Sequence, residues 1–171
     1  MNYYQASPDS PFHLSVGAVP IDKKGNVYCH YWKQKREFTD LYSLMRETME
    51  QGETIEKTFE RGLMEEFGMT GKVVDYVGSI TAVDEWFGEI NRPTNVEKTT
   101  LYFLVDVISI DESKRLVEDE ESDSQITCIP IHELIEKMEE VFNRTKINYF
   151  AEAKILKSVL NLLKNSEDVK L

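Results

Sequence analysis

Residues 47–69 read ETMEQGETIEKTFERGLMEEFGM and contain the strongest local pattern in the chain. An apolar side chain recurs every fourth residue and forms one stripe along a helix: Ile55, Phe59, Leu63 and Phe67. Thr54 can accept hydrogen bonds from the free N–H groups of a first turn, and Gly68 is suited to cap the last turn. The stretch therefore predicts a short amphipathic helix between Thr54 and Gly68.

The other face of this predicted helix carries charged side chains. Glu65 and Glu66 are adjacent, and Arg61 lies one turn before Glu65. Adjacent carboxylates repel each other, so the pair gains most when a cation neutralises it, and hard oxygen ligands suit Mg²⁺ or Mn²⁺. For a Glu-Glu pair taken alone, a solvated acidic face is the alternative interpretation.

The spacing of these residues resembles the Nudix box, G-x5-E-x7-R-E-U-x-E-E-x-G-U, in which U is an apolar residue. The matching fixed positions are Glu53, Arg61, Glu65, Glu66 and Gly68, and the apolar positions hold Leu63 and Met69. Two positions depart from the pattern: Glu47 stands where it has its first glycine, and Gly62 where it has the glutamate after arginine.

The resemblance implies a Mg²⁺- or Mn²⁺-dependent hydrolase that acts on a nucleoside diphosphate linked to another group. Carried over by position, Glu65 and Glu66 are metal ligands, Arg61 orients the carboxylates, and Glu53 braces the preceding loop against the helix. These four residues form the predicted catalytic set. Arg46 is grouped with the substrate-binding residues, because the family often adds a backbone carbonyl ligand just before the box.

Gly62 removes a side chain that in the family is a metal ligand or the base that activates water. Either a carboxylate elsewhere replaces it, or the site binds its ligand without hydrolysis. In Nudix proteins a carboxylate well beyond the box often reaches back to the metal, and the resemblance therefore implies Glu120 as that ligand. The candidates considered together are Glu118, Asp119, Glu120, Glu121, Asp84 and Glu85.

Alternation and apolar periodicity predict strands at 12–21, 26–32, 41–45, 72–82, 98–110 and 125–131, and further helices at 132–142 and 149–163. Segments 33–40 and 46–53 are interpreted as loops. Together with the box these elements fit an α/β fold, the Nudix-type α/β/α sandwich with a mixed β-sheet and a box helix. We expect a flexible arm at 1–11, one domain at 12–164 and a polar tail at 165–171.

Aromatic side chains offer surfaces for stacking a base. Trp86 and Phe87 lie in a loop with glycine and proline, so we predict that these two contact substrate. A place in the core is the alternative for every aromatic considered, the others being Tyr28, Trp32 and Tyr102. His30 is interpreted as a structural residue of its strand.

Acidic residues outnumber basic ones 31 to 20 over 171 residues, and the net charge of −11 disfavours binding to a nucleic-acid polymer. The chain has no apolar run long enough for a membrane helix and no signal-peptide pattern. Cys29 and Cys128 are isolated, and we expect both to be buried, reduced thiols of a cytoplasmic protein.

These residues bear on three candidate functions. A hydrolase of a nucleotide-type small molecule is favoured by the matching box residues, and a module that binds a nucleotide or partner without hydrolysis is favoured by Gly62 and Glu47. An isomerase of the related diphosphate type needs a catalytic cysteine, and neither Cys29 nor Cys128 has the expected context. No pattern in the sequence identifies the leaving group of the substrate. The sequence does not fix the oligomeric state, and a homodimer is one of the possible states.

Overall fold

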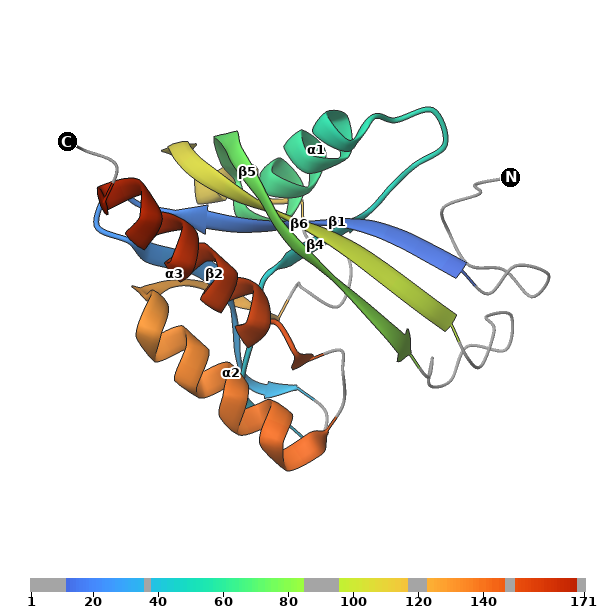
Figure 1. The fold of residues 1–171 in the computed structure, drawn as a ribbon. Coiled ribbons are helices and arrows are strands. Elements are labelled where there is room, and N and C mark those ends of the chain that lie inside the picture. Colours follow the sequence, from blue (N-terminus) through green and yellow to red (C-terminus); the bar gives the residue numbers. More distant parts are fainter. Residues whose placement is uncertain (1–11, 36–37, 85–95, 117–122, 147–149, 169–171) are drawn as a thin grey trace.

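A computed structural model describes residues 12–35, 38–84, 96–116, 123–146 and 150–168. Within this part of the chain, seven strands join in one mixed sheet (Figure 1). The strands are β1 (Phe12–Ile21), β2 (Asn26–Lys35), β3 (Phe38–Ser43), β4 (Met45–Thr48), β5 (Met69–Asp84), β6 (Val96–Ile110) and β7 (Gln125–Pro130). The helices are α1 (Ile55–Phe67), α2 (Ile131–Thr145) and α3 (Ala153–Asp168), with a short 3₁₀ turn η1 (Glu112–Lys114).

The sheet has two parts that are joined by the hairpin between β1 and β2. These two strands pair at Ile21 and Val27, next to the turn, and then diverge. Beyond the hairpin, β1 pairs in parallel with β6 and antiparallel with β4, while β2 pairs antiparallel with β3 and β7. Strand β5 pairs antiparallel with β6 and forms an outer edge of the sheet.

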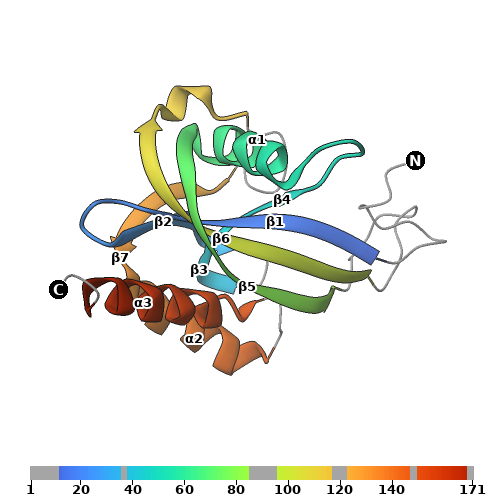
Figure 2. The same cartoon turned by 45° about the horizontal axis from the view of Figure 1, so that its top comes forward.

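Helices cover both faces of this sheet, which gives the expected α/β/α sandwich (Figure 2). Helix α1 lies on one face, and its apolar stripe packs on β1 and β4 through Phe59, Leu63 and Phe67. Helices α2 and α3 cover the opposite face and bury a second cluster that includes Leu134 and Leu156. Because α1 carries Arg61, Glu65 and Glu66, the predicted catalytic residues belong to the α1 side of the sheet.

Helix α1 begins and ends where the sequence predicts. The Thr54 side chain accepts a hydrogen bond from the Lys57 N–H, and Gly68 adopts a left-handed conformation with φ of 61°. That conformation brings the Gly68 N–H to the Met64 carbonyl at 2.9 Å, which satisfies one of the free carbonyls of the last turn.

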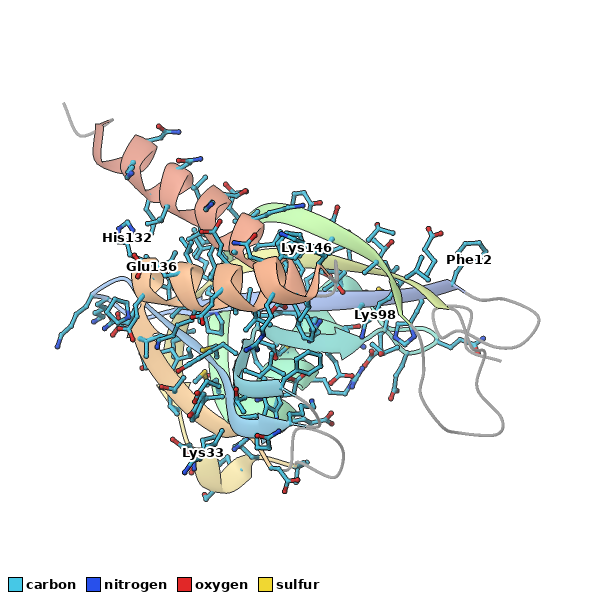
Figure 3. The ribbon with its side chains drawn as sticks, turned by 90° about the horizontal axis from the view of Figure 1, so that it is seen from below. Phe12, Lys33, Lys98, His132, Glu136 and Lys146 are labelled. Carbon is cyan, nitrogen blue, oxygen red and sulfur yellow. The ribbon has the colours of Figure 1, made fainter. Side chains whose placement is uncertain are left out.

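Helix α2 on the other face of the sheet is also amphipathic. His132 and Glu136, four residues apart, lie on its exposed side, whereas Leu134 and Met138 are buried (Figure 3). The helix ends at Lys146, which takes a left-handed conformation and donates its N–H to the Phe142 carbonyl. No helix in the described ranges is long and apolar enough to cross a membrane.

Several predicted boundaries were wrong. Segment 33–40 is largely strand and not loop, since β2 continues to Lys35 and β3 begins at Phe38. The expected loop 46–53 begins with three strand residues, because β4 pairs with β1. Helix α3 starts later than predicted and runs to Asp168, so it includes the first four residues of the expected tail. Long-range pairing and packing, which local periodicity does not encode, set these limits.

Candidate metal and catalytic site

Arg61 is the centre of a cluster of carboxylates on α1 and its neighbours. Its Nε and Nη2 donate to the two oxygens of Glu53, each at 2.9 Å, and Nη2 also reaches the Thr48 carbonyl at 2.8 Å. Its Nη1 lies 2.9 Å from Glu47 Oε1 and 3.4 Å from Glu65 Oε2. One guanidinium thus links the loop before α1, strand β4 and the acidic face of the helix.

Glu53 ties the entrance of α1 to this guanidinium. The paired hydrogen bonds from Arg61 lower the pKa of Glu53 to about 2, and further hydrogen bonds come from the Glu50 N–H and the Thr58 hydroxyl. In turn, the hydrogen bonds to Glu53 raise the pKa of Arg61. This paired geometry holds the arginine in place and joins the loop before α1 to the helix.

Glu47 has the opposite electrostatic environment. Burial raises its pKa to about 7, and the negative charge of Glu66 acts in the same direction. The neighbouring Glu65 charge adds to this, while Arg61 opposes it. A carboxyl in this environment gains stabilisation as an anion when further positive charge arrives.

Glu66 is held by a histidine that the sequence analysis left without a functional role. His30 on β2 is 1% exposed, and its Nε2 lies 2.6 Å from Glu66 Oε2. Its Nδ1 lies 2.8 Å from the Ser124 hydroxyl. His30 and Glu66 are 36 residues apart, and no local pattern links them; the packing of β2 beside α1 brings them together.

The chain after β6 lies against the C-terminal end of α1. The Leu116 N–H donates to the Glu65 carbonyl at 2.9 Å, and Arg115 Nε donates to the Glu66 carbonyl at 2.6 Å. Arg115 Nη2 also reaches the Ser124 hydroxyl at 3.1 Å. These contacts fix the backbone of both adjacent glutamates.

The donor set fits a hard divalent cation. Carboxylate oxygens of Glu47 and Glu65 face Arg61, and Glu66 lies near enough to Glu47 for its charge to raise the pKa of Glu47. Carboxylate ligands of this kind suit Mg²⁺ or Mn²⁺. Among the residues that the structure describes, no three acidic, histidine or cysteine side chains already stand at mutual metal-binding distance. Their carboxylates point instead at Arg61 and His30, so a metal ion would take over contacts that these two groups now make.

Several predicted site residues fall outside the described ranges. These are Glu85, Trp86, Phe87, Glu118, Asp119, Glu120 and Glu121, and for Asp84 only the backbone is described. Their proposed roles in metal binding and substrate stacking stay predictions from the sequence.

Arg46 lies on the other face of β4 from Glu47. Its Nε is 3.6 Å from Glu152 Oε1, and Glu152 is 2% exposed. Tyr102 Oη and the Leu44 N–H donate to the same carboxylate at 2.7 and 3.0 Å. The arginine side chain therefore belongs to a buried polar network under α3, away from the carboxylates around Arg61.

The remaining aromatic and cysteine predictions have clear outcomes. Trp32 and Tyr102 are 3% and 1% exposed and belong to the core. Cys29 is also buried, which raises the pKa of its thiol, and it packs in the cluster under α2 and α3. The expectation that Cys128 is buried was wrong, because β7 leaves its side chain exposed. The placement of Cys29 counts against the isomerase alternative.

A shallow polar hollow of about 470 Å³ lies at β2, β3 and the start of β7. It is lined by Tyr31, Lys33, Gln34, Thr39, Asp40, Asp123 and Gln125. None of these residues belongs to the 47–69 stretch, although Tyr31 and Asp123 are the chain neighbours of His30 and Ser124.

The model of the NUDIX domain family matches residues 11–150, which is most of the chain. The chain belongs to the Nudix family. Its fold is similar to that of a NUDIX hydrolase from Nitrosomonas europaea, at 16% identity and a TM-score of 0.55, covering 82% of this chain and 86% of that one. It is also similar to the solution structure of the E. coli ORF135 protein, at 14% identity and a TM-score of 0.56, covering 87% and 90%. No curated protein matches the chain by sequence.

Family membership supports a Nudix-type hydrolase in general. The Nudix box of this chain includes α1, and two of its matching residues, Glu53 and Glu65, contact a third, Arg61. The two departures from the box, Glu47 and Gly62, lie next to each other where β4 crosses α1.

Proposed function

We propose that this Nudix protein is a divalent-metal-dependent hydrolase that cleaves a diphosphate linkage in a nucleoside diphosphate-linked small molecule. The observation that carries the proposal is the convergence of Glu53 and Glu65 on Arg61, with Glu66 fixed beside them by His30. The Glu65-Glu66 pair would hold Mg²⁺ or Mn²⁺ on the exposed side of α1.

The reaction is attack of water on one phosphorus of the diphosphate, with cleavage of the bridging P–O bond. The water supplies a hydroxyl to one product, its proton leaves to a base or to solvent, and the bridging oxygen stays with the other product. A bound Mg²⁺ or Mn²⁺ would neutralise the phosphate charge and lower the pKa of the attacking water. Arg61 fixes the positions of the carboxylates that it contacts, and His30 restricts the rotamer of Glu66.

A second candidate function is binding of the nucleotide without hydrolysis. It is favoured by one observation, the glycine at position 62, which supplies no oxygen ligand from the helix. In this case metal and nucleotide would still bind through Glu65 and Glu66, and no product would form.

Product release from a nucleotide panel separates the two candidates. The panel contains ADP-ribose, a dinucleoside polyphosphate, a sugar nucleotide and nucleoside triphosphates, each with Mg²⁺ or Mn²⁺. Hydrolysis predicts turnover of at least one member that is lost in Glu66→Gln and retained in Glu60→Gln, a matched change at an exposed residue of the same helix. Metal-dependent binding without product would establish the second candidate.

A further inference from the structure

Gly62 lies where α1 approaches β4 too closely for a side chain. A Cβ added at Gly62 would lie 2.6 Å from Glu47 Cβ, 3.1 Å from Glu47 Cγ and 3.0 Å from Met45 Sδ. The first distance is far inside van der Waals contact for two carbon atoms. A Cβ position is fixed by its backbone, so rotation of the Glu47 side chain cannot relieve it.

Strand β4 is held in this position by its own pairing. Met45, Arg46, Glu47 and Thr48 pair with Ala18, Gly17, Val16 and Ser15 of β1. Moving Glu47 away from the helix would disturb this ladder and the buried cluster that joins Met45 to Leu63. Positions 47 and 62 are therefore in direct contact, and one of them has to be glycine for the other to carry a large side chain.

The Glu47 carboxylate reaches the charged cluster from the strand. Its side chain is 18% exposed, and its Oε1 lies 2.9 Å from Arg61 Nη1, the same nitrogen that faces Glu65. In the Nudix box pattern the glycine stands at position 47 and the glutamate at position 62. This chain holds the same two residues exchanged between two touching positions.

We propose that Glu47 replaces the box glutamate that is absent at Gly62, and that its carboxylate binds the divalent cation together with Glu65 and Glu66. The carboxylate then comes from β4 and not from α1. The absence of a side chain at Gly62 leaves the space that the Glu47 side chain occupies. This inference rests on the proposed function for the identity of the cation, and it assigns the third ligand to a residue within the described fold.

The test measures Mn²⁺ binding without nucleotide, by the decrease of the free Mn²⁺ electron paramagnetic resonance signal. Glu47→Gln removes the charge, keeps the side-chain volume and adds no clash. We expect it to weaken Mn²⁺ binding by about tenfold or more, since even the loss of a group that only supports a metal ligand costs about ten- to a hundredfold. Glu60→Gln serves as the matched control and leaves the affinity unchanged.

The reciprocal exchange provides an independent arm. Gly62→Glu alone places its Cβ against Glu47 Cβ, and we expect a lower thermal midpoint than in the wild type. Glu47→Gly alone loses the ligand and weakens Mn²⁺ binding. The double variant Glu47→Gly/Gly62→Glu restores the family order, and we expect both the thermal midpoint and the Mn²⁺ affinity to return towards wild-type values.

Four results would overturn the inference: wild-type Mn²⁺ affinity in Glu47→Gln, no recovery in the double variant, no Mn²⁺ binding by the wild type, or loss of affinity in Glu120→Gln but not in Glu47→Gln. The hydrolase proposal is tested by a different result, the turnover of the nucleotide panel. Mn²⁺ binding that depends on Glu47, in a protein without turnover on the nucleotide panel, retains this inference and overturns hydrolysis.

Discussion

Replacing Gly62 by alanine tests the contact between α1 and β4 with a single methyl group. Glycine in a helix interior is less favourable than alanine by about 1 kcal/mol, so propensity alone predicts that Gly62→Ala stabilises the protein. Packing predicts the opposite, because the new Cβ would lie 2.6 Å from Glu47 Cβ. The sign of the change in unfolding free energy decides which effect dominates.

The geometry favours the packing term. Overfilling a well-packed site costs about 1–3 kcal/mol, and this clash involves a Cβ that the β4 ladder holds in place. Subtracting the propensity gain leaves an expected loss of up to about 2 kcal/mol in the free energy of unfolding. For a chain of this length that corresponds to a decrease of up to about 8 °C in the thermal midpoint.

Urea unfolding with EDTA present, followed by tryptophan fluorescence and circular dichroism, measures this change without a metal contribution. The control is Gly62→Ala in a Glu47→Gly background, where the nearest remaining neighbour is Met45 Sδ at 3.0 Å, an atom of an unbranched side chain that can change rotamer. There we expect alanine to be neutral or stabilising by up to about 1 kcal/mol. Stabilisation in the wild-type background, or equal effects in both, would refute the reasoning.

Three further predictions follow from the site. Glu53→Gln should lower the unfolding free energy at pH 7 because it removes the ion pair with Arg61, and solvent screening of this partly exposed pair limits the loss to about 1–2 kcal/mol. Because the pKa of Glu53 is lowered from 4.5 to about 2, the difference between variant and wild type should disappear as the pH falls from 4.5 to 2. A difference that persists at pH 2 would contradict this role of the charge. His30→Leu should weaken Mn²⁺ binding by about tenfold or more through loss of the Glu66 contact, with an unchanged circular dichroism spectrum; unchanged affinity would remove His30 from the site. A thiol reagent should label the exposed Cys128 in the native protein and the buried Cys29 only after denaturation, which mass spectrometry of labelled peptides would establish.

Residues whose signals are local were predicted well. Thr54, the apolar stripe and Gly68 specify where α1 begins, which face it buries and where it ends, and all three lie within one stretch of the chain. The strand patterns of β1, β6 and β7 were also correct in their main extent, because alternation and β-branched residues reflect burial on a sheet.

Contacts between distant segments were not predicted. His30 is indistinguishable from other strand histidines until β2 is placed beside α1, and the contact with Glu66 spans 36 residues. The side of β4 on which Arg46 lies follows from its pairing with β1, and this pairing places it next to Glu152 instead of the carboxylates. Such relationships depend on sheet register, which a one-residue shift would reverse.

The sequence by itself determined the family, the box helix and the chemistry of the residues on its exposed face, because spacing along one helix is a local property. It left Glu47 and Gly62 as two separate departures from the Nudix pattern. Tertiary structure decided that they are one feature, since the pairing of β4 with β1 brings Glu47 Cβ within 2.6 Å of the position that a Gly62 Cβ would occupy. Two atoms cannot share that space, and steric exclusion between positions 15 residues apart is a property of the folded chain alone.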